Sequence, residues 1–204
     1  MCSWCWGFSP VLEGLLKRLP AHVKLQYVMG GLAPDSDISM PKEMQGNVQN
    51  AWRKVSATTA ASFNWEFWEK CEPRRSTYPA CRAAIAGGLQ GAQPEMFTAL
   101  QRAYYLEARN PSDASTHMAV AGELGLDTEQ FSEDLVSGRV EELLQKDFAL
   151  RTELGVYEFP SLILKTGKGN HAIVRGWGTL DVVWKRMERL IASALLCLAI
   201  LIPD

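Results

Sequence analysis

Two cysteines three positions apart, Cys2 and Cys5, open this chain where an amphipathic helix is expected to begin. The apolar residues between positions 8 and 19 follow the i, i+3, i+4, i+7 spacing of one buried helix face. A sulfur at a helix start lies near unpaired N–H groups and the positive end of the helix dipole, which favours the thiolate. A second sulfur one turn later can resolve a mixed disulfide. The motif therefore predicts a redox pair, with Cys2 as the attacking thiolate and Cys5 as the resolving thiol.

The same cysteines could instead be half of a zinc site or two inert buried thiols. A zinc site needs a second ligand pair at similar spacing, but Cys71, Cys81 and Cys197 lie ten or more positions apart. The three histidines form no closely spaced pair. We therefore expect no metal. Cys71 and Cys81 are expected to be small buried hydrophobes, with a second redox pair as the alternative, and Cys197 to be inert packing.

Composition limits the class of protein further. A formal net charge of −2 without a basic cluster argues against nucleic-acid binding. Five cysteines among 204 residues are too few for a disulfide scaffold and suit a reducing compartment, so we expect a cytoplasmic protein. The longest apolar run, residues 190–202, is shorter than the ~20 residues that a membrane helix needs. We interpret this run as a buried C-terminal helix.

Periodicity and turn residues give a coarse order of helix, strand, a block of helices, strand, strand and helix. Alternating residues predict a strand at 23–29, and two short apolar runs around the turn at 166–170 predict a hairpin. Between residues 31 and 155 there is almost no strand signal. Strands are therefore expected only near the two ends of the chain.

Five segments carry a resemblance to a known family. They are residues 1–8 (MCSWCWGF), 28–34 (VMGGLAP), 76–82 (STYPACR), 103–107 (AYYLE) and 155–162 (GVYEFPSL). With the element order, they resemble the DsbA-like oxidoreductases, and in particular the bacterial group related to FrnE and often labelled protein-disulfide isomerase. The resemblance implies an α/β protein with a thioredoxin fold and a large all-helical insertion. The thioredoxin-like domain would comprise residues 1–30 and 156–204, and the insertion residues 31–155.

The resemblance also implies a substrate-facing loop at Phe159 and Pro160. Proteins of this fold carry a cis-proline before the third strand, facing the redox pair, and Pro160 stands at that place. The Phe159 backbone would then be presented to an extended substrate, in a short version of strand addition. Ser3, Trp4 and Trp6 would complete the substrate-binding surface, with the two indoles as an apolar rim.

One departure from the family concerns the strand that normally precedes the redox motif. Here the chain opens on the motif itself, so a central strand of the sheet is missing and its neighbours would keep unpaired backbone groups. Either the working protein is longer, or another segment or chain fills the gap. We expect the first.

The leading functional hypothesis is a thiol–disulfide oxidoreductase or isomerase acting on protein or small-molecule disulfides. It would need no cofactor beyond the dithiol, with glutathione or a thioredoxin-type protein as a possible reductant. One alternative is a glutathione-dependent transferase or isomerase, like the related kappa-class transferases and hydroxychromene-carboxylate isomerases, which use serine where Cys2 stands. Another is a non-catalytic binding module.

Overall fold

The computed structural model describes residues 1–192 and 197–204, which form two compact units. One unit, here called the sheet unit, comprises residues 2–30 and 148–204. The other, the helical unit, comprises residue 1 and residues 31–147. Strand-forming segments from both ends of the chain thus belong to one unit, as the element order predicts.

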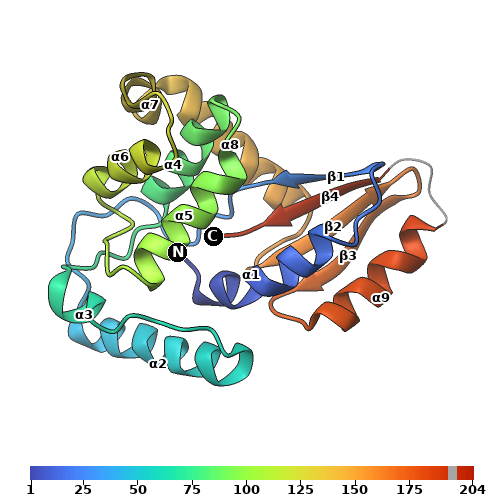
Figure 1. Ribbon diagram of the computed structural model, residues 1–204, viewed down its shortest axis with the longest axis horizontal. Coiled ribbons are helices and arrows are strands. Elements are labelled where there is room, and N and C mark those ends of the chain that lie inside the picture. The colour runs from blue at the N-terminus through green and yellow to red at the C-terminus, as the bar shows by residue number, and fades with distance from the viewer. Residues whose placement is uncertain (193–196) are drawn as a thin grey trace. The chain divides into compact units, whose positions relative to one another are not determined.

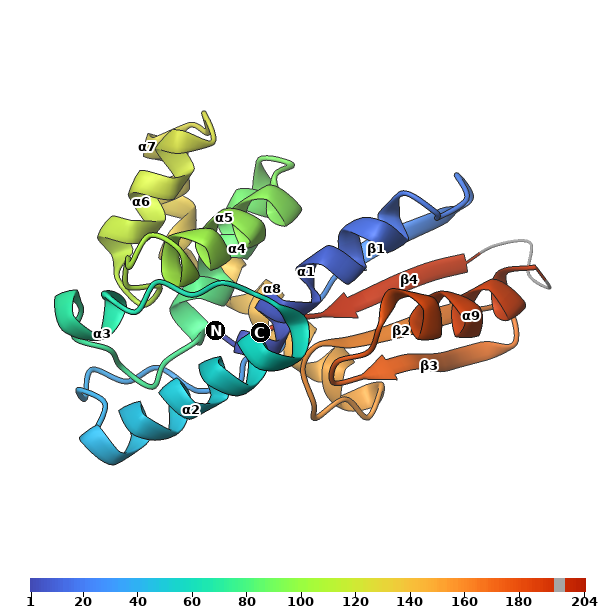
Figure 2. The same ribbon diagram turned by 60° about the horizontal axis from the view of Figure 1, so that its bottom comes forward.

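The sheet unit contains a four-stranded sheet in the order β1-β4-β2-β3 (Figures 1 and 2). Its strands are β1 (Val23–Tyr27), β2 (Ser161–Thr166), β3 (Gly169–Arg175) and β4 (Cys197–Ile202). β4 pairs with β1 in parallel and with β2 antiparallel, and β2 and β3 form the predicted hairpin. The C-terminal strand therefore lies inside the sheet, with a neighbour on each side (Figure 2).

The prediction of a C-terminal helix over residues 190–202 is wrong for residues 197–202, which form a strand. Helix α9 (Leu180–Ile191) ends near its start, residues 193–196 lie outside the described part of the chain, and Cys197–Ile202 is a strand. Five of the six β4 residues are buried, because the strand has neighbours on both edges and side chains packed on its faces. Such a strand is a continuous apolar run, which periodicity does not distinguish from a buried helix.

β4 also changes the expectation about the missing central strand. In the structure, β4 lies between β1 and β2, so a segment of this chain fills the gap. This is the second of the two explanations given above for the missing strand, and not the one that we expected. The register pairs Ile200 with Gln26 of β1 and with Ile163 of β2. The backbone groups that a missing strand would leave unpaired are thereby hydrogen-bonded.

Helices α1 (Ser3–Leu16) and α9 lie on the same face of this sheet (Figures 1 and 2). A Cβ atom at Gly14 of α1 would approach Leu180 Cδ2 of α9 to 2.5 Å, so glycine permits the close contact of the two helices. Phe8 and Leu15, both 2% exposed, belong to the buried face that the α1 periodicity predicts. This packing fixes the axis of the helix that carries the two cysteines.

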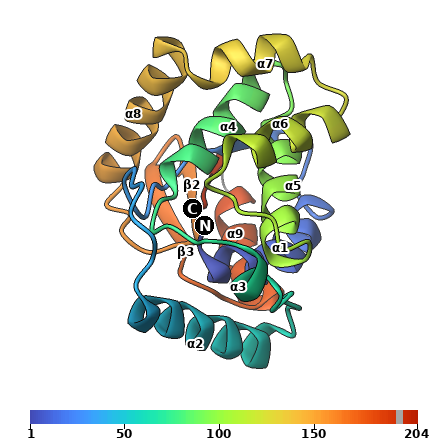
Figure 3. The same ribbon diagram turned by 90° about the vertical axis from the view of Figure 1, so that its left-hand side faces the viewer.

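The helical unit contains no named strand in its described residues (Figure 3). Its elements are α2 (Lys42–Thr59), α3 (Phe67–Lys70), α4 (Tyr78–Leu89), α5 (Gln93–Tyr105), α6 (Ala114–Glu123), α7 (Thr128–Leu135) and the first part of α8 (Gly138–Glu153). Asp127 caps α7, since its Oδ1 accepts the Gln130 N–H at 3.0 Å. The Asp127 N–H donates to Gln90 Oε1 at 2.9 Å.

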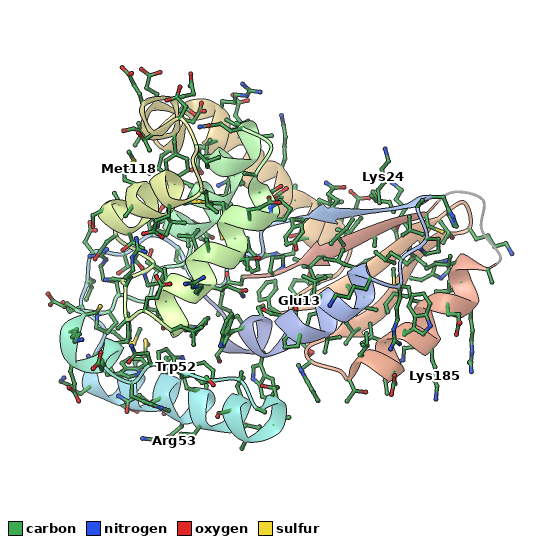
Figure 4. All side chains as sticks on the ribbon, viewed as in Figure 1. Glu13, Lys24, Trp52, Arg53, Met118 and Lys185 are labelled. Atoms are coloured by element: carbon green, nitrogen blue, oxygen red, sulfur yellow. The ribbon has the colours of Figure 1, made fainter. Side chains whose placement is uncertain are left out.

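Aromatic side chains form the core beneath α2. Trp52 is fully buried and lies within 5.0 Å, centroid to centroid, of the Phe63 and Trp68 rings, while its neighbour Arg53 points away from the core (Figure 4). Trp65 is 40% exposed and stacks with the Arg53 guanidinium. The aromatic residues at 63–68 therefore contribute mainly to packing.

The division between the units falls within α8, between residues 147 and 148. The boundary expected from the sequence, after residue 155, lies about two turns later. Leu150 and Leu154 explain the difference, because both pack against the core of the sheet unit. Among the described residues, no helix has the length and apolar character needed to cross a membrane.

Candidate active site

Cys2 occupies the N-cap of α1, the position immediately before the first helical residue. Its backbone is extended, with φ −85° and ψ 123°, and its carbonyl accepts the N–H groups of Cys5 at 3.1 Å and Trp6 at 3.4 Å. These bonds close the first turn of the helix. Cys2 is partly buried and Cys5 is 5% exposed, so the first sulfur is the more accessible of the two.

The two cysteines interact with each other and differ in acidity. The Cys5 thiol lowers the pKa of Cys2 most, and the backbone N–H groups of Cys5 and Trp4 lower it further, against opposing effects of burial and of the Asp204 charge. Burial raises the pKa of Cys5 well above that of an ordinary thiol, and the neighbouring Cys2 raises it more. Cys2 is therefore the cysteine that ionises more readily, and the Cys5 thiol is placed to donate a hydrogen bond to the Cys2 thiolate once it forms.

Alkylation of the reduced protein should reflect this difference. Because the pKa of Cys2 is lowered in the folded protein, iodoacetamide should label Cys2 first, and its rate should rise with pH through a midpoint below that of an ordinary thiol. Cys5 should react only after unfolding. Peptide mapping after timed labelling measures both rates. Equal labelling of the two sites, or a midpoint at the value of a free thiol, would contradict the assignment.

The loop before β2 lies against the redox pair. The Phe159–Pro160 peptide bond is cis, and the Cys2 sulfur lies 3.6 Å from the Phe159 carbonyl oxygen, which can accept a hydrogen bond from Cys2 while its thiol is protonated. Cys5 and Phe159 belong to one buried cluster, against which Cys2 packs. Residues that are 157 positions apart in the sequence thus come together as the resemblance implies.

Sequence reasoning missed Asp204. Its carbonyl accepts the Cys2 backbone N–H at 2.9 Å, and the residue is 2% exposed. Nothing in the sequence points to it, because a lone aspartate after an apolar run has no partner at a recognisable spacing. Only the pairing of β4 brings it to the start of α1.

The remaining residues singled out from the sequence differ in their burial and contacts. Ser3, Trp4 and Trp6 are partly buried in the first turn of α1, and their contact with a substrate stays a prediction. Cys71 donates to the Ala108 carbonyl at 3.0 Å, and Cys81 is buried in α4.

None of the five cysteines, which all lie in the described residues, forms a disulfide bond, and Cys197 is 7% exposed in β4. The described part of the chain holds no group of three or more cysteine, histidine or acidic residues suited to a metal.

A dithiol at a helix start, beside a proline loop that leads into a mixed sheet, defines a protein with the thioredoxin-like fold of disulfide oxidoreductases. The thioredoxin family model Thioredoxin_5 matches residues 1–183, and the chain belongs to this family.

Solved structures with the same fold cover almost the whole chain. A candidate protein disulfide isomerase from Nitrosomonas europaea has a TM-score of 0.81 at 24% identity, covering 95% of this chain and 94% of that one. The cytosolic disulfide reductase DsbM from Pseudomonas aeruginosa has a TM-score of 0.77 at 20% identity, with 95% and 96% covered. At these identities the likeness shows the DsbA-like fold with its helical insertion.

The curated relatives that match in sequence are named as adapter proteins, and not as disulfide oxidoreductases. The ClpXP adapter protein SpxH of Bacillus subtilis is 26% identical over 165 residues, which are 79% of this chain and 54% of that protein. The SpxH protein of Bacillus cereus (strain ATCC 10987 / NRS 248) is 23% identical over 94% of this chain and 66% of its own length. The chain thus spans about half to two thirds of the curated relatives that it matches.

Proposed function

We propose that this chain is a thiol–disulfide oxidoreductase that uses Cys2 and Cys5 as its redox pair. The observation that carries the proposal is the placement of the two cysteines in the first turn of α1, where the more accessible Cys2 lies at the N-cap beside the Phe159 carbonyl. The pKa of Cys2 is lowered there, and the pKa of Cys5 is raised. A nucleophile must be ionised and accessible, whereas a resolving thiol must stay protonated until the mixed disulfide has formed. The two cysteines meet these opposite requirements.

The reaction then needs two exchange steps. The Cys2 thiolate attacks one sulfur of a substrate disulfide, forming a mixed disulfide, and the released thiolate takes a proton from water. Cys5 gives its proton to solvent and attacks the Cys2 sulfur, which breaks the mixed disulfide, releases the second substrate thiolate and leaves a Cys2–Cys5 disulfide. Two electrons have passed from the dithiol to the substrate, and two molecules of a thiol reductant such as glutathione restore the dithiol.

The loop at Phe159 and the first turn of α1 would hold the substrate. The Phe159 carbonyl lies 3.6 Å from the Cys2 sulfur, so a peptide running along this loop would bring its disulfide to the nucleophile. Trp4 and Trp6 would supply an apolar rim and Ser3 a hydroxyl in the same turn. These roles suit extended or unfolded polypeptides that contain disulfides.

We propose that the protein acts in the cytoplasm and that glutathione is its reductant. Two observations on a structural relative support this choice: DsbM is named a cytosolic disulfide reductase, and it has also been solved with glutathione, with a TM-score of 0.76 to this chain at 19% identity. A transferase role is less well supported, because the kappa-class enzymes described above have serine where this chain has Cys2.

Equilibration with glutathione tests the proposal directly. In buffers of varied reduced-to-oxidised glutathione ratio, the protein should change between a dithiol and a Cys2–Cys5 disulfide in one two-electron transition. Acid quenching, alkylation and mass spectrometry measure the two forms. The same protein should accelerate the reduction of insulin disulfides by glutathione. If no Cys2–Cys5 disulfide forms at any ratio, the proposed function fails.

A second candidate function is that of a protein-binding adapter. It is favoured by the sequence likeness to SpxH proteins over 79% to 94% of this chain. An adapter would bind its partner through a surface and would not need thiol exchange. Partner binding that survives replacement of both Cys2 and Cys5 by serine would support this role.

A further inference from the structure

We propose that the buried Asp204 side chain is a positioning residue of the redox pair that makes the dithiol a stronger reductant. The inference rests on the proposed function and adds to it a direction of electron flow. It starts from the placement of β4, because Asp204, two residues after the end of this strand, contacts the turn at which α1 begins.

Backbone hydrogen bonds hold the end of β4 and the two residues that follow it. The Val28 N–H donates to the Leu201 carbonyl at 2.9 Å, and the Gly30 N–H donates to the Pro203 carbonyl at 2.7 Å. The Asp204 carbonyl then accepts the Cys2 N–H at 2.9 Å. Asp204 is therefore tied at its own backbone to the residue that carries the nucleophile.

Space at this point is limited. A Cβ atom at Gly30 would come within 2.6 Å of the Pro203 carbonyl oxygen and would also meet the Phe159 ring. Ile202 and Phe159 belong to the same buried cluster as Cys5, and Asp204 itself is 2% exposed. Water and salt therefore screen the Asp204 carboxylate only weakly from the neighbouring sulfurs.

The charge acts on both sulfurs in the same direction. The Asp204 carboxylate raises the pKa of Cys2 and of Cys5, because a nearby negative charge disfavours a second one. Among the described residues, the charged or titratable groups identified as acting on the two sulfurs are the other cysteine and Asp204. A backbone hydrogen bond from Asp204 to the Cys5 sulfur works in the opposite direction and does not depend on the carboxylate.

This repulsion raises the free energy of the reduced protein and leaves that of the oxidised protein nearly unchanged. The dithiol form contains the Cys2 thiolate, whereas the disulfide carries no charge. A neighbouring carboxylate therefore destabilises the reduced form and favours loss of electrons to a substrate. The opposite arrangement, in which the reduced form is stabilised, gives the strong oxidant DsbA. Asp204 thus favours a disulfide reductase.

The test compares Asp204→Asn with the wild-type protein in glutathione buffers. The equilibrium constant for dithiol plus oxidised glutathione going to protein disulfide plus two reduced glutathione should fall about tenfold, which corresponds to ~30 mV. The alkylation midpoint of Cys2 should move to lower pH in the same variant. Asp204→Glu, which keeps the charge, should remain closer to the wild type. Asp181→Asn is the matched control, since that carboxylate is 81% exposed in α9 of the same unit.

The outcomes separate this inference from the proposed function. If the wild type forms the disulfide but Asp204→Asn leaves the equilibrium constant and the alkylation midpoint unchanged, the role of Asp204 is refuted and the redox pair stands. If the wild type forms no disulfide, the proposed function itself fails. Asp204→Ser provides a second neutral variant should the asparagine protein not fold, and the same direction of change is required of it.

Discussion

Replacing Cys2 with serine is expected to reduce the insulin-disulfide reductase rate to that of glutathione alone. A hydroxyl at the start of α1 stays protonated at neutral pH and is a poor nucleophile toward sulfur. Cys5→Ser should behave differently, because the Cys2 thiolate still attacks the substrate but nothing resolves the product. This variant should accumulate a mixed disulfide that is visible as a mass increase on non-reducing gels and by intact-mass spectrometry.

Cys71→Ser is the matched control for these variants. Cys71 is partly exposed in the helical unit and donates to the Ala108 carbonyl, and a serine hydroxyl can make the same bond. Its activity should therefore equal that of the wild type. Wild-type activity in Cys2→Ser would refute the oxidoreductase proposal, whereas inactivity of all three variants would indicate damage to folding.

Local signals in the sequence account for the elements that were predicted correctly. The α1 start at Cys2 and the hairpin of β2 and β3 each depend on residues close together in the chain. Periodicity, capping residues and turn residues are sufficient for such elements. The nearness of Phe159 to Cys2 depended on the family resemblance, because no local pattern relates residues so far apart.

The two features that escaped prediction are both consequences of β4. The run 190–202 has the composition of any buried apolar segment, and its assignment as a strand depends on the gap between β1 and β2. Asp204 acquires its environment only after that pairing, since burial and nearness to the sulfurs are properties of the folded sheet. A redox site can therefore contain a charged group that no motif includes.

The placement of β4 leads to a large expected effect on stability. Ile200 is 2% exposed at the middle of the strand, where it is paired with Gln26 and Ile163 and belongs to the cluster that includes Cys5. Replacing it with alanine removes buried methyl and methylene groups and leaves a cavity, so we expect Ile200→Ala to lower the free energy of unfolding by about 3 kcal/mol. Urea denaturation followed by circular dichroism measures this change.

Val182→Ala is the control for this variant, because Val182 is 47% exposed on α9 of the same unit and its truncation should cost less than about 0.5 kcal/mol. Hydrogen exchange adds spatial detail: amides of β1 and β2 should exchange faster in Ile200→Ala, since β4 hydrogen-bonds to both strands. Equal effects of the two truncations would mean that residues 197–202 do not complete the sheet. The position of Asp204 beside the redox pair would then lose its basis, because it depends on the same strand.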